Sequence, residues 1–187
     1  MTATRHLPYW ITAAVVLVTF GGLLAMGRDL ICPCGHIDLW HDGQPANESS
    51  QHLMDWYTPS HLLHGFLFYA ALWLVANRIP FGWKLAISVA VECVWEVIEN
   101  SAWVIDRYRA VTISLDYNGD SVINSTVDIL AMIVGFYLAR AIPVWASVAI
   151  VIGFEVLTAY LIRDGLALNV LMLLYPLEAV LQWQGGG

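Results

Sequence analysis

The sequence predicts an all-α, polytopic transmembrane helical bundle of about six spans, organised as one integral membrane domain over residues 1–187. Of the 187 residues, 59% are apolar and only 12% are charged. An average soluble domain is about 45–50% apolar and about 25% charged. The apolar residues also fall into runs near the roughly 20 residues that a helix needs to cross a bilayer. These observations exclude a disordered chain, a coiled coil and an ordinary soluble enzyme.

Six apolar runs define the expected spans, and short turns or longer polar segments separate them. Pro80 precedes one of the runs and Pro143 begins another, and proline at a helix start costs no hydrogen bond. Two long connections, 28–59 and 106–121, are expected as outer loops on one face, with both termini on the other. The spans are expected at 8–27, 60–76, 81–105, 122–141, 143–162 and 166–183.

The charge pattern bears on orientation and partners. Each face receives four basic residues, but the short loops, which weigh more in the positive-inside rule, carry the set that includes Arg78 and Arg140. Both termini are therefore expected in the cytoplasm. The net charge of −7 leaves no basic patch, which excludes nucleic acid as a partner and leaves the lipid bilayer as the expected one.

The third span places three carboxyl groups on one helix face. At 100° per residue, Glu92, Glu96 and Glu99 fall on a single narrow stripe. A carboxylate at mid-membrane costs at least a few kcal/mol, so lipid cannot solvate that stripe. It must face other helices or a water-filled cavity.

The neighbouring spans offer matching polar faces. Asp120, Asn124 and Asp128 stand at i, i+4 and i+8, and Gly135 on the same face allows a close helix approach. His61 and His64 are three residues apart, so their rings can converge on one point.

Five carboxylates and two imidazoles on three consecutive segments cannot all be charged side by side. Protons, the guanidinium groups of Arg107 and Arg109, or a divalent metal would relieve the repulsion. Carboxylates with imidazole suit Zn, Mn or Fe, and carboxylates alone suit Mg or Ca. A hydrogen-bonded structural network without chemistry, a metal or catalytic site, and a proton or ion path all remain open.

The catalytic interpretation assigns roles by residue type. Acid–base chemistry is expected of Glu96, Glu99, Asp120 and Asn124. Metal ligation is expected of His61, His64, Glu92 and Asp128. Guanidinium forks match phosphate, so an anionic head group is expected at Arg107 and Arg109.

A cysteine-containing loop follows the first span. Cys32, Cys34 and His36 could ligate a soft or borderline metal, act in redox chemistry, form a disulfide, or make a plain turn. The one-residue spacing makes a bridge between the two cysteines awkward.

Three functions follow from these patterns. The leading hypothesis is a membrane-embedded, metal-assisted enzyme acting on a lipid-linked or amphiphilic substrate. The alternatives are a proton-coupled transporter and a non-catalytic subunit of a larger membrane complex.

Two resemblances accompany these residues. The segments 95–100, 106–109 and 119–124, with the Cys-Pro-Cys-Gly and Ser-His-Leu-Leu-His-Gly stretches, are similar to an uncharacterised family of alphaproteobacterial inner-membrane proteins, a domain of unknown function. This likeness covers nearly the whole chain. More remotely, the order Glu, Arg, Asp-x-x-x-Asn, Gly resembles VanZ-like membrane proteins, from which the extra glutamates and the cysteine loop depart. The resemblance implies a multi-pass protein of the bacterial inner membrane and little about chemistry.

Overall fold

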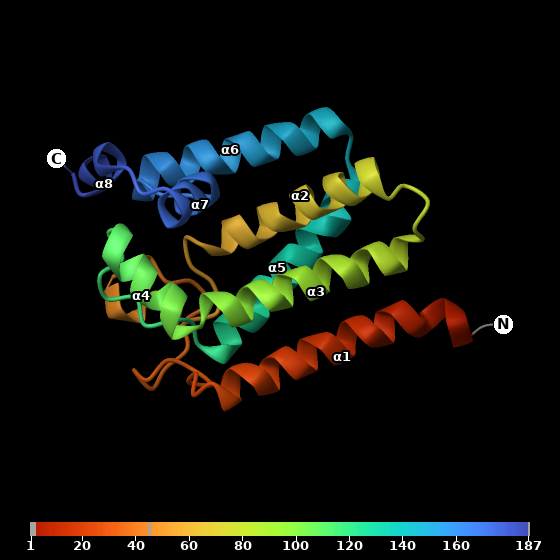
Figure 1. Cartoon of the computed structure of the whole chain (residues 1–187), viewed down its shortest axis with the longest axis horizontal. Helices are drawn as coiled ribbons and strands as arrows, with labels where there is room; N and C mark the ends of the chain where they lie inside the picture. Colours follow the sequence, from red (N-terminus) through yellow and green to blue (C-terminus); the bar gives the residue numbers. More distant parts are fainter. Residues whose placement is uncertain (1–2, 45, 187) are drawn as a thin grey trace.

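The protein is all-helical. A computed structural model describes residues 3–44 and 46–186, and these residues form eight α-helices, one short 3₁₀ helix at Ala46–Glu48 and no strand. Five long helices run side by side, and the three short ones gather at one end of the bundle (Figure 1). The α-helices are α1 (Ala3–Ala25), α2 (Thr58–Val75), α3 (Phe81–Glu99), α4 (Ala102–Val111), α5 (Val122–Ala141), α6 (Val144–Ile162), α7 (Leu166–Leu174) and α8 (Glu178–Gln184). The predicted helical class is confirmed, and residues 1, 2, 45 and 187 of the predicted domain lie outside the described residues.

The core lies between α3 and α5, with α1 and α2 closing its sides. Val89 of α3 and Met132 and Phe136 of α5 are fully buried there. Phe68 and Tyr69 of α2 pack against this cluster. Close packing of these side chains holds α2, α3 and α5 together, because many small dispersion contacts add up.

Two glycines bring α2 and α5 into direct contact. A Cβ atom on Gly65 would lie 2.8 Å from the carbonyl carbon of Gly135, and a Cβ on Gly135 would lie 3.0 Å from that of Leu62. Only glycine therefore fits at either position. The prediction that Gly135 allows a close helix approach is confirmed, and its partner is Gly65.

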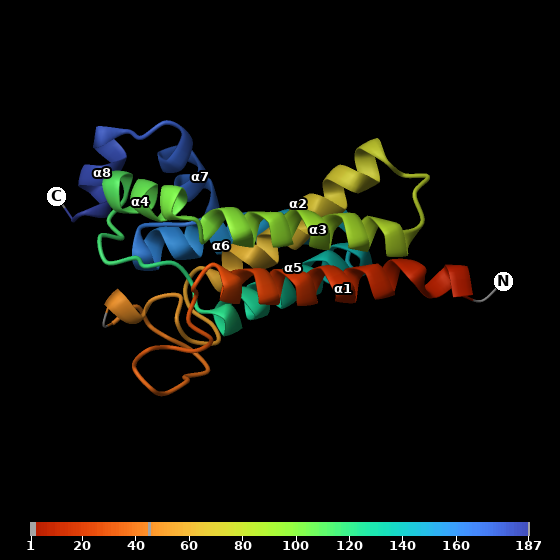
Figure 2. The same ribbon diagram turned by 60° about the horizontal axis from the view of Figure 1, so that its bottom comes forward.

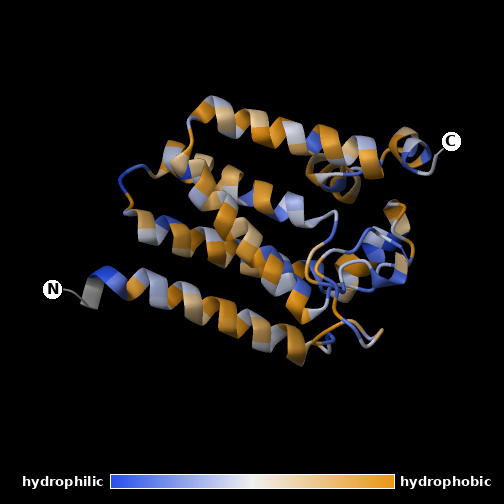
Figure 3. Cartoon of the chain, turned by 180° about the vertical axis from the view of Figure 1, so that it is seen from behind, coloured by the Kyte–Doolittle hydropathy of each residue, from blue (hydrophilic) through white to orange (hydrophobic). Residues whose placement is uncertain are grey.

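Among the described residues, three helices are long and apolar enough to cross a membrane: residues Arg5–Ala25 of α1, α5 and α6. The helices α2 and α3 have 18 and 19 residues, but histidines and glutamates make them more polar. Apolar residues dominate the long helices, and hydrophilic ones gather at the end that holds α4 (Figure 3). The helices support membrane association, while the prediction of six spans exceeds what their length and composition show.

The expected third and sixth spans are shorter in the structure. The segment predicted as 81–105 ends at Glu99, because Ser101 starts a new helix by accepting a hydrogen bond from the backbone N–H of Val104. As a result, α4 occupies part of the expected outer loop 106–121. The segment predicted as 166–183 is broken at Pro176, since proline disfavours helix at the residue before it. With nine residues, α7 is about 14 Å long, too short to cross about 30 Å of hydrocarbon.

This break changes the expected arrangement of the termini. Figures 1 and 2 show the start of α1 at one end of the bundle and α8 at the other, the end that also holds α4. Six full spans would have placed both termini on one face. In the described residues, the start of the first helix and the last helix instead lie at opposite ends of the bundle.

The long loop between α1 and α2 is tied to the start of α5. The backbone N–H groups of Ser121 and Val122 donate to the carbonyls of Ser50 and Asp29. The Ser121 hydroxyl donates to the carbonyl of Gln51 and accepts from the N–H of Asn124 as the N-cap of α5. These bonds hold the loop against the bundle at the end where the polar residues lie.

Candidate functional site

Two histidines of α2 enclose one glutamate of α3. The Nδ1 atom of His61 lies 2.8 Å from Oε1 of Glu92, and Nδ1 of His64 lies 2.9 Å from Oε2. Glu92 is fully buried and His61 nearly so. One turn of helix separates the histidines, which places both rings on the same carboxylate.

Around this centre lie three carboxyl groups with unsatisfied oxygen atoms. Both side-chain oxygens of Glu96, Oε2 of Glu99 and Oδ1 of Asp128 are buried without a hydrogen-bond partner. Glu96 Oε1 lies 3.4 Å from His61 Nδ1, and Asp128 Oδ2 lies 3.9 Å from His61 Nε2. Such unpaired buried oxygens call for a proton or a cation.

Histidine is the cation of every ion pair within 4.0 Å in the described residues. No arginine or lysine of that part of the chain neutralises the carboxyl cluster. Two of the four groups of possible ligand atoms in the described residues belong to this cluster: His61 with His64 and Glu92, and His61 with Glu96 and Glu99. Within each group, the ligand atoms lie within 4.8 Å of one another. Mixed imidazole and carboxylate ligands suit Zn, Mn or Fe. The donor set therefore fits a divalent metal ion.

Asp120 lies at the edge of this cluster. Its carboxylate accepts hydrogen bonds from the side-chain amide of Asn100 at 2.8 Å and from the Tyr117 hydroxyl at 2.9 Å. Burial raises the pKa of Asp120, and these two hydrogen bonds oppose the rise. Burial also raises the pKa of Tyr117, with the Asp120 charge as the next cause. Asp120 is thus a buried acid whose carboxylate accepts hydrogen bonds from two donors.

Asn100 was not singled out from the sequence, although it lies within the segment that carries the family resemblance. It ends α3 and joins three elements: its amide donates to the Glu96 carbonyl, to Asp120 and to the Ser125 hydroxyl. Its Oδ1 accepts the backbone N–H of Asp120 at 2.7 Å. Its polar character next to Glu99, at the end of an apolar run, is the signal that could have identified it.

Asn124 is separate from the carboxyl cluster in its bonding. Its side-chain amide donates to the backbone carbonyl of His52 at 2.9 Å, and its N–H is used by the Ser121 cap. This geometry makes Asn124 an anchor for the long loop. The catalytic role predicted for Asn124 stays a prediction.

The two arginines predicted to bind an anion differ in their surroundings. Arg107 donates from Nε to the carbonyl of Leu173 in α7, at 3.1 Å. Arg109 donates from Nε to the carbonyl of Tyr117 and from Nη2 to the side chain of Asn118. Arg107 therefore attaches α4 to α7, whereas Arg109 faces the loop before α5.

The cysteine loop forms a disulfide between Cys32 and Cys34. The disulfide alternative thus holds in spite of the close spacing, and thiolate ligation is unavailable to this oxidised form. His36 is exposed and lies 3.4 Å from Asp38. Nearby His52 accepts the Asp38 N–H at Nδ1 and lies 3.2 Å from Glu48 at Nε2, so both of its ring nitrogens are engaged.

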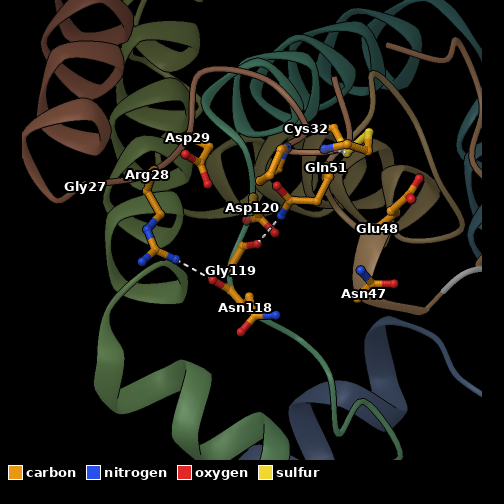
Figure 4. A pocket seen from close by; sticks show the side chains of 12 residues that line it. Gly27, Arg28, Asp29, Cys32, Asn47, Glu48, Gln51, Asn118, Gly119 and Asp120 are labelled. Atoms are coloured by element: carbon orange, nitrogen blue, oxygen red, sulfur yellow. Dashed lines mark hydrogen bonds between the residues drawn. A yellow bond between two sulfur atoms is a disulfide. The ribbon is translucent and has the colours of Figure 1, made fainter. Parts of the chain in front are cut away.

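A polar pocket of about 590 Å³ opens beside this loop, at the same end of the bundle. Figure 4 shows Arg28 reaching from the end of α1 toward Asn118 and Gly119, with Gln51 and Asp120 on the pocket wall. The Gln51 amide donates to the Gly119 carbonyl at 2.6 Å. Through Asp120, this pocket borders the buried carboxyl cluster.

Fold and site together define a class: an all-helical protein that has apolar helices able to cross a membrane and a buried histidine–carboxylate cluster between α2, α3 and α5. The chain belongs to the family described as "Protein of unknown function (DUF2585)", whose model matches residues 23–186. The predicted membership of an uncharacterised alphaproteobacterial family is confirmed. The likeness to VanZ-like proteins stays a prediction.

Relatives in several bacteria match along almost the whole chain. A UPF0314 protein of Paracoccus denitrificans is 64% identical, covering 98% of this chain and 95% of its own length. A UPF0314 protein of Novosphingobium aromaticivorans is 52% identical over 93% of this chain and 88% of the relative. The UPF0314 protein RL4541 of Rhizobium johnstonii is 50% identical, with shares of 97% and 94%. No solved structure matches the chain.

Proposed function

We propose that this protein is an integral membrane protein of the bacterial inner membrane that binds a divalent metal ion between α2, α3 and α5 and acts as a metal-assisted enzyme on a lipid-linked or amphiphilic substrate. The observation that carries the proposal is the set of buried, unpaired carboxyl oxygens around His61. These oxygen atoms are shielded from water, and no arginine or lysine of the described residues forms an ion pair with them. A metal ion would satisfy them.

The chain's own residues suggest how such a site would be organised. His61 and His64 would be ligands, with Glu92 as a third ligand or as the acceptor that orients both rings. Glu96, Glu99 and Asp128 would complete the ligand set or move protons. A bound metal ion supplies Lewis acidity and lowers the pKa of a coordinated water molecule.

The location of the cluster supports an amphiphilic substrate. It lies near the polar end of helices that are otherwise apolar, and the pocket of about 590 Å³ opens at that end. A substrate with a polar head and an apolar tail could reach this region from the membrane.

Metal content of the purified protein tests the proposal. Full-length protein is loaded with Zn, Mn or Fe in detergent, desalted and analysed by inductively coupled plasma mass spectrometry. Wild type should retain stoichiometric metal, while Glu96→Gln should lower its affinity about tenfold or more. Glu155→Gln is the matched control, because Glu155 already accepts the N–H groups of Leu166 and Ala167 at the start of α7. Wild type without stoichiometric metal would refute the metal centre.

The enzymatic part needs a separate measurement. Metal-loaded wild type and Glu96→Gln are incubated with a polar lipid extract from an alphaproteobacterium, and the products are compared by mass spectrometry. A product that depends on both metal and Glu96 supports the enzyme. Metal binding without any change in the extract would support a metal-binding protein and refute the enzymatic function.

The same unpaired oxygens favour a second candidate, proton-coupled transport, in which they carry protons instead of facing a metal ion. Flux assays in proteoliposomes separate the two candidates. Transport that depends on a pH gradient and fails in Glu96→Gln, with no metal bound, would support the transporter.

A further inference from the structure

Two arginines from distant parts of the chain meet at one residue. Arg28, just after α1, donates from Nη1 to the backbone carbonyl of Asn118. Arg109, in the last turn of α4, donates from Nη2 to the side-chain oxygen of the same asparagine. Both guanidinium groups therefore converge on the loop before α5.

Neither arginine forms an ion pair within the described residues, although Asp29 and Asp120 line the larger pocket with Arg28. In the described residues, neither guanidinium lies within 4.0 Å of a carboxylate oxygen. The Nε atom of Arg28 is shielded from solvent and has no hydrogen-bond partner. A guanidinium has five N–H donors, and the bonds found use one of Arg28 and two of Arg109. Several donors thus remain for a ligand.

The local backbone keeps Arg28 in this place. Gly119 has φ +84°, a conformation that glycine adopts readily, and a Cβ there would collide with Arg28 Nη1. The same Cβ would lie 2.9 Å from Oδ1 of Asn100. The arginine can lie against the loop only because the side chain of residue 119 is absent.

A cavity adjoins the pair. Arg28 and Arg109 line a pocket of about 480 Å³ together with Asn100, Ser101 and the exposed acid Asp106. Arg28 and Asn118 also line the larger pocket shown in Figure 4, so the two pockets meet at these residues. The arginine pair therefore lies between a surface opening and the pocket that borders Asp120.

Arg28 and Arg109 lie at the height along the bundle where a lipid head group is expected. Trp103, on the same helix as Arg109, is 75% exposed. Exposed tryptophans of membrane proteins concentrate at the interface between hydrocarbon and water. Arg28 follows directly on the end of the apolar helix α1.

We infer that Arg28 and Arg109 bind the phosphate group of an anionic amphiphile at the polar end of the bundle. Planar guanidinium forks match phosphate oxygens and hold them with charge-assisted hydrogen bonds. This assignment replaces Arg107 by Arg28 in the pair expected from the sequence. The inference rests on the proposed function for the idea that the bound amphiphile is a substrate.

Binding of short-chain phosphatidic acid tests the inference. Full-length protein in neutral detergent, stripped of metal with EDTA, is titrated with dihexanoyl phosphatidic acid, with the matching diacylglycerol and with inorganic phosphate. We expect phosphatidic acid to bind at least about tenfold more tightly than diacylglycerol, because only the former carries phosphate. Inorganic phosphate should compete but bind more weakly, since it lacks the acyl chains. Inorganic phosphate that binds as tightly as phosphatidic acid would overturn the amphiphile and identify a free-phosphate site.

Matched variants localise the binding. Arg28→Gln and Arg109→Gln should each weaken phosphatidic acid binding about tenfold. Arg107→Gln removes the same charge from the same helix and should leave the affinity unchanged. Equal losses in all three variants, or equal binding of phosphatidic acid and diacylglycerol to wild type, would overturn the inference. The wild-type comparison remains decisive should a glutamine variant fail to fold.

The metal-free condition keeps this test apart from that of the proposed function. If the protein binds phosphatidic acid but retains no metal, the phosphate site is supported and the metal-assisted enzyme is refuted. If the protein retains metal but binds phosphatidic acid and diacylglycerol equally well, the metal centre is supported and the phosphate site is refuted.

Discussion

Replacing Gly65 by alanine should separate α2 from α5 and destabilise the bundle. The added Cβ would lie 2.8 Å from the carbonyl carbon of Gly135 and closer still to the Met132 oxygen and the Phe136 nitrogen. All three are backbone atoms, which cannot move aside as a flexible side chain can. Overpacking in a well-packed core costs about 1–3 kcal/mol, and this contact belongs at the upper end.

The measured effect follows from that energy. At about 2–4 °C per kcal/mol for a chain of this size, Gly65→Ala should lower the unfolding temperature by about 5–10 °C. The assay is thermal unfolding in detergent, followed by intrinsic fluorescence and by size-exclusion chromatography. Because His61 lies one turn before Gly65, the shift of α2 should also weaken metal binding at the proposed centre.

Gly153 provides the matched control. It lies within α6, and a Cβ there would meet nothing within 4 Å. Alanine favours helix over glycine by about 0.5–1 kcal/mol, so Gly153→Ala should unfold at the same or a higher temperature than wild type. Equal unfolding temperatures for Gly65→Ala and wild type would refute the close contact between α2 and α5.

Three further variants test other parts of the structure. Glu92→Gln leaves one side-chain oxygen to accept hydrogen bonds from two imidazoles, so it should lower the free energy of unfolding by about 1–3 kcal/mol. Thermal melts measure the loss, and Glu178→Gln, which changes an exposed residue, should melt like wild type. Burial raises the pKa of Asp164 to about 6, above its value of about 3.9 in the unfolded chain. Protonated Asp164 therefore stabilises the fold fully below about pH 4, and this stabilisation is lost as the pH rises through 6. Relative to Asp164→Asn, the wild type should therefore lose about 3 kcal/mol between pH 4 and pH 7 in denaturant titrations. Ser121→Ala removes the cap on the Asn124 N–H and should cost about 1 kcal/mol or more in the same titrations.

Each of these variants has an outcome that would contradict it. An unchanged melt of Glu92→Gln would mean that the two imidazoles do not depend on this carboxylate. Parallel stability profiles of wild type and Asp164→Asn across the pH range would show that Asp164 titrates at its ordinary pKa. A Ser121→Ala chain as stable as wild type would place the first turn of α5 outside the cooperative fold.

The helix faces were predictable because they depend on local periodicity. Glu92 and Glu96 recur at the helical period, as do His61 and His64, and the structure brings these four side chains together. The pattern fixes which residues share a face within one helix. It also indicated that a narrow polar stripe must contact another helix, since lipid cannot solvate it.

Helix ends were harder to predict, because hydrophobicity continues across them. Trp103 and Ile105 extend the apolar run past Glu99, yet the cap at Ser101 starts α4 there. In the last run, Pro176 marks the break between α7 and α8, a local signal that a search for apolar length does not weigh.

Long-range polar contacts lay beyond the sequence pattern altogether. Arg28 meets Arg109 only because the chain returns to the same end of the bundle, and no spacing rule connects them. The anchoring of Arg107 to Leu173 likewise depends on where α7 lies relative to α4. Residue type predicted an anion-binding arginine but not which two arginines share one loop.

His61 belongs to both sets of ligand atoms, and this shared membership governs how any bound ion can be located. A substitution that removes the His61 imidazole would disrupt both possible metal positions at once, so it cannot distinguish them. His64 belongs to one set and Glu99 to the other, so each reports on a single position. Two single variants, His64→Ala and Glu99→Gln, would therefore map an ion along α3 with a resolution of about one to two helical turns, which no substitution of the central histidine can achieve.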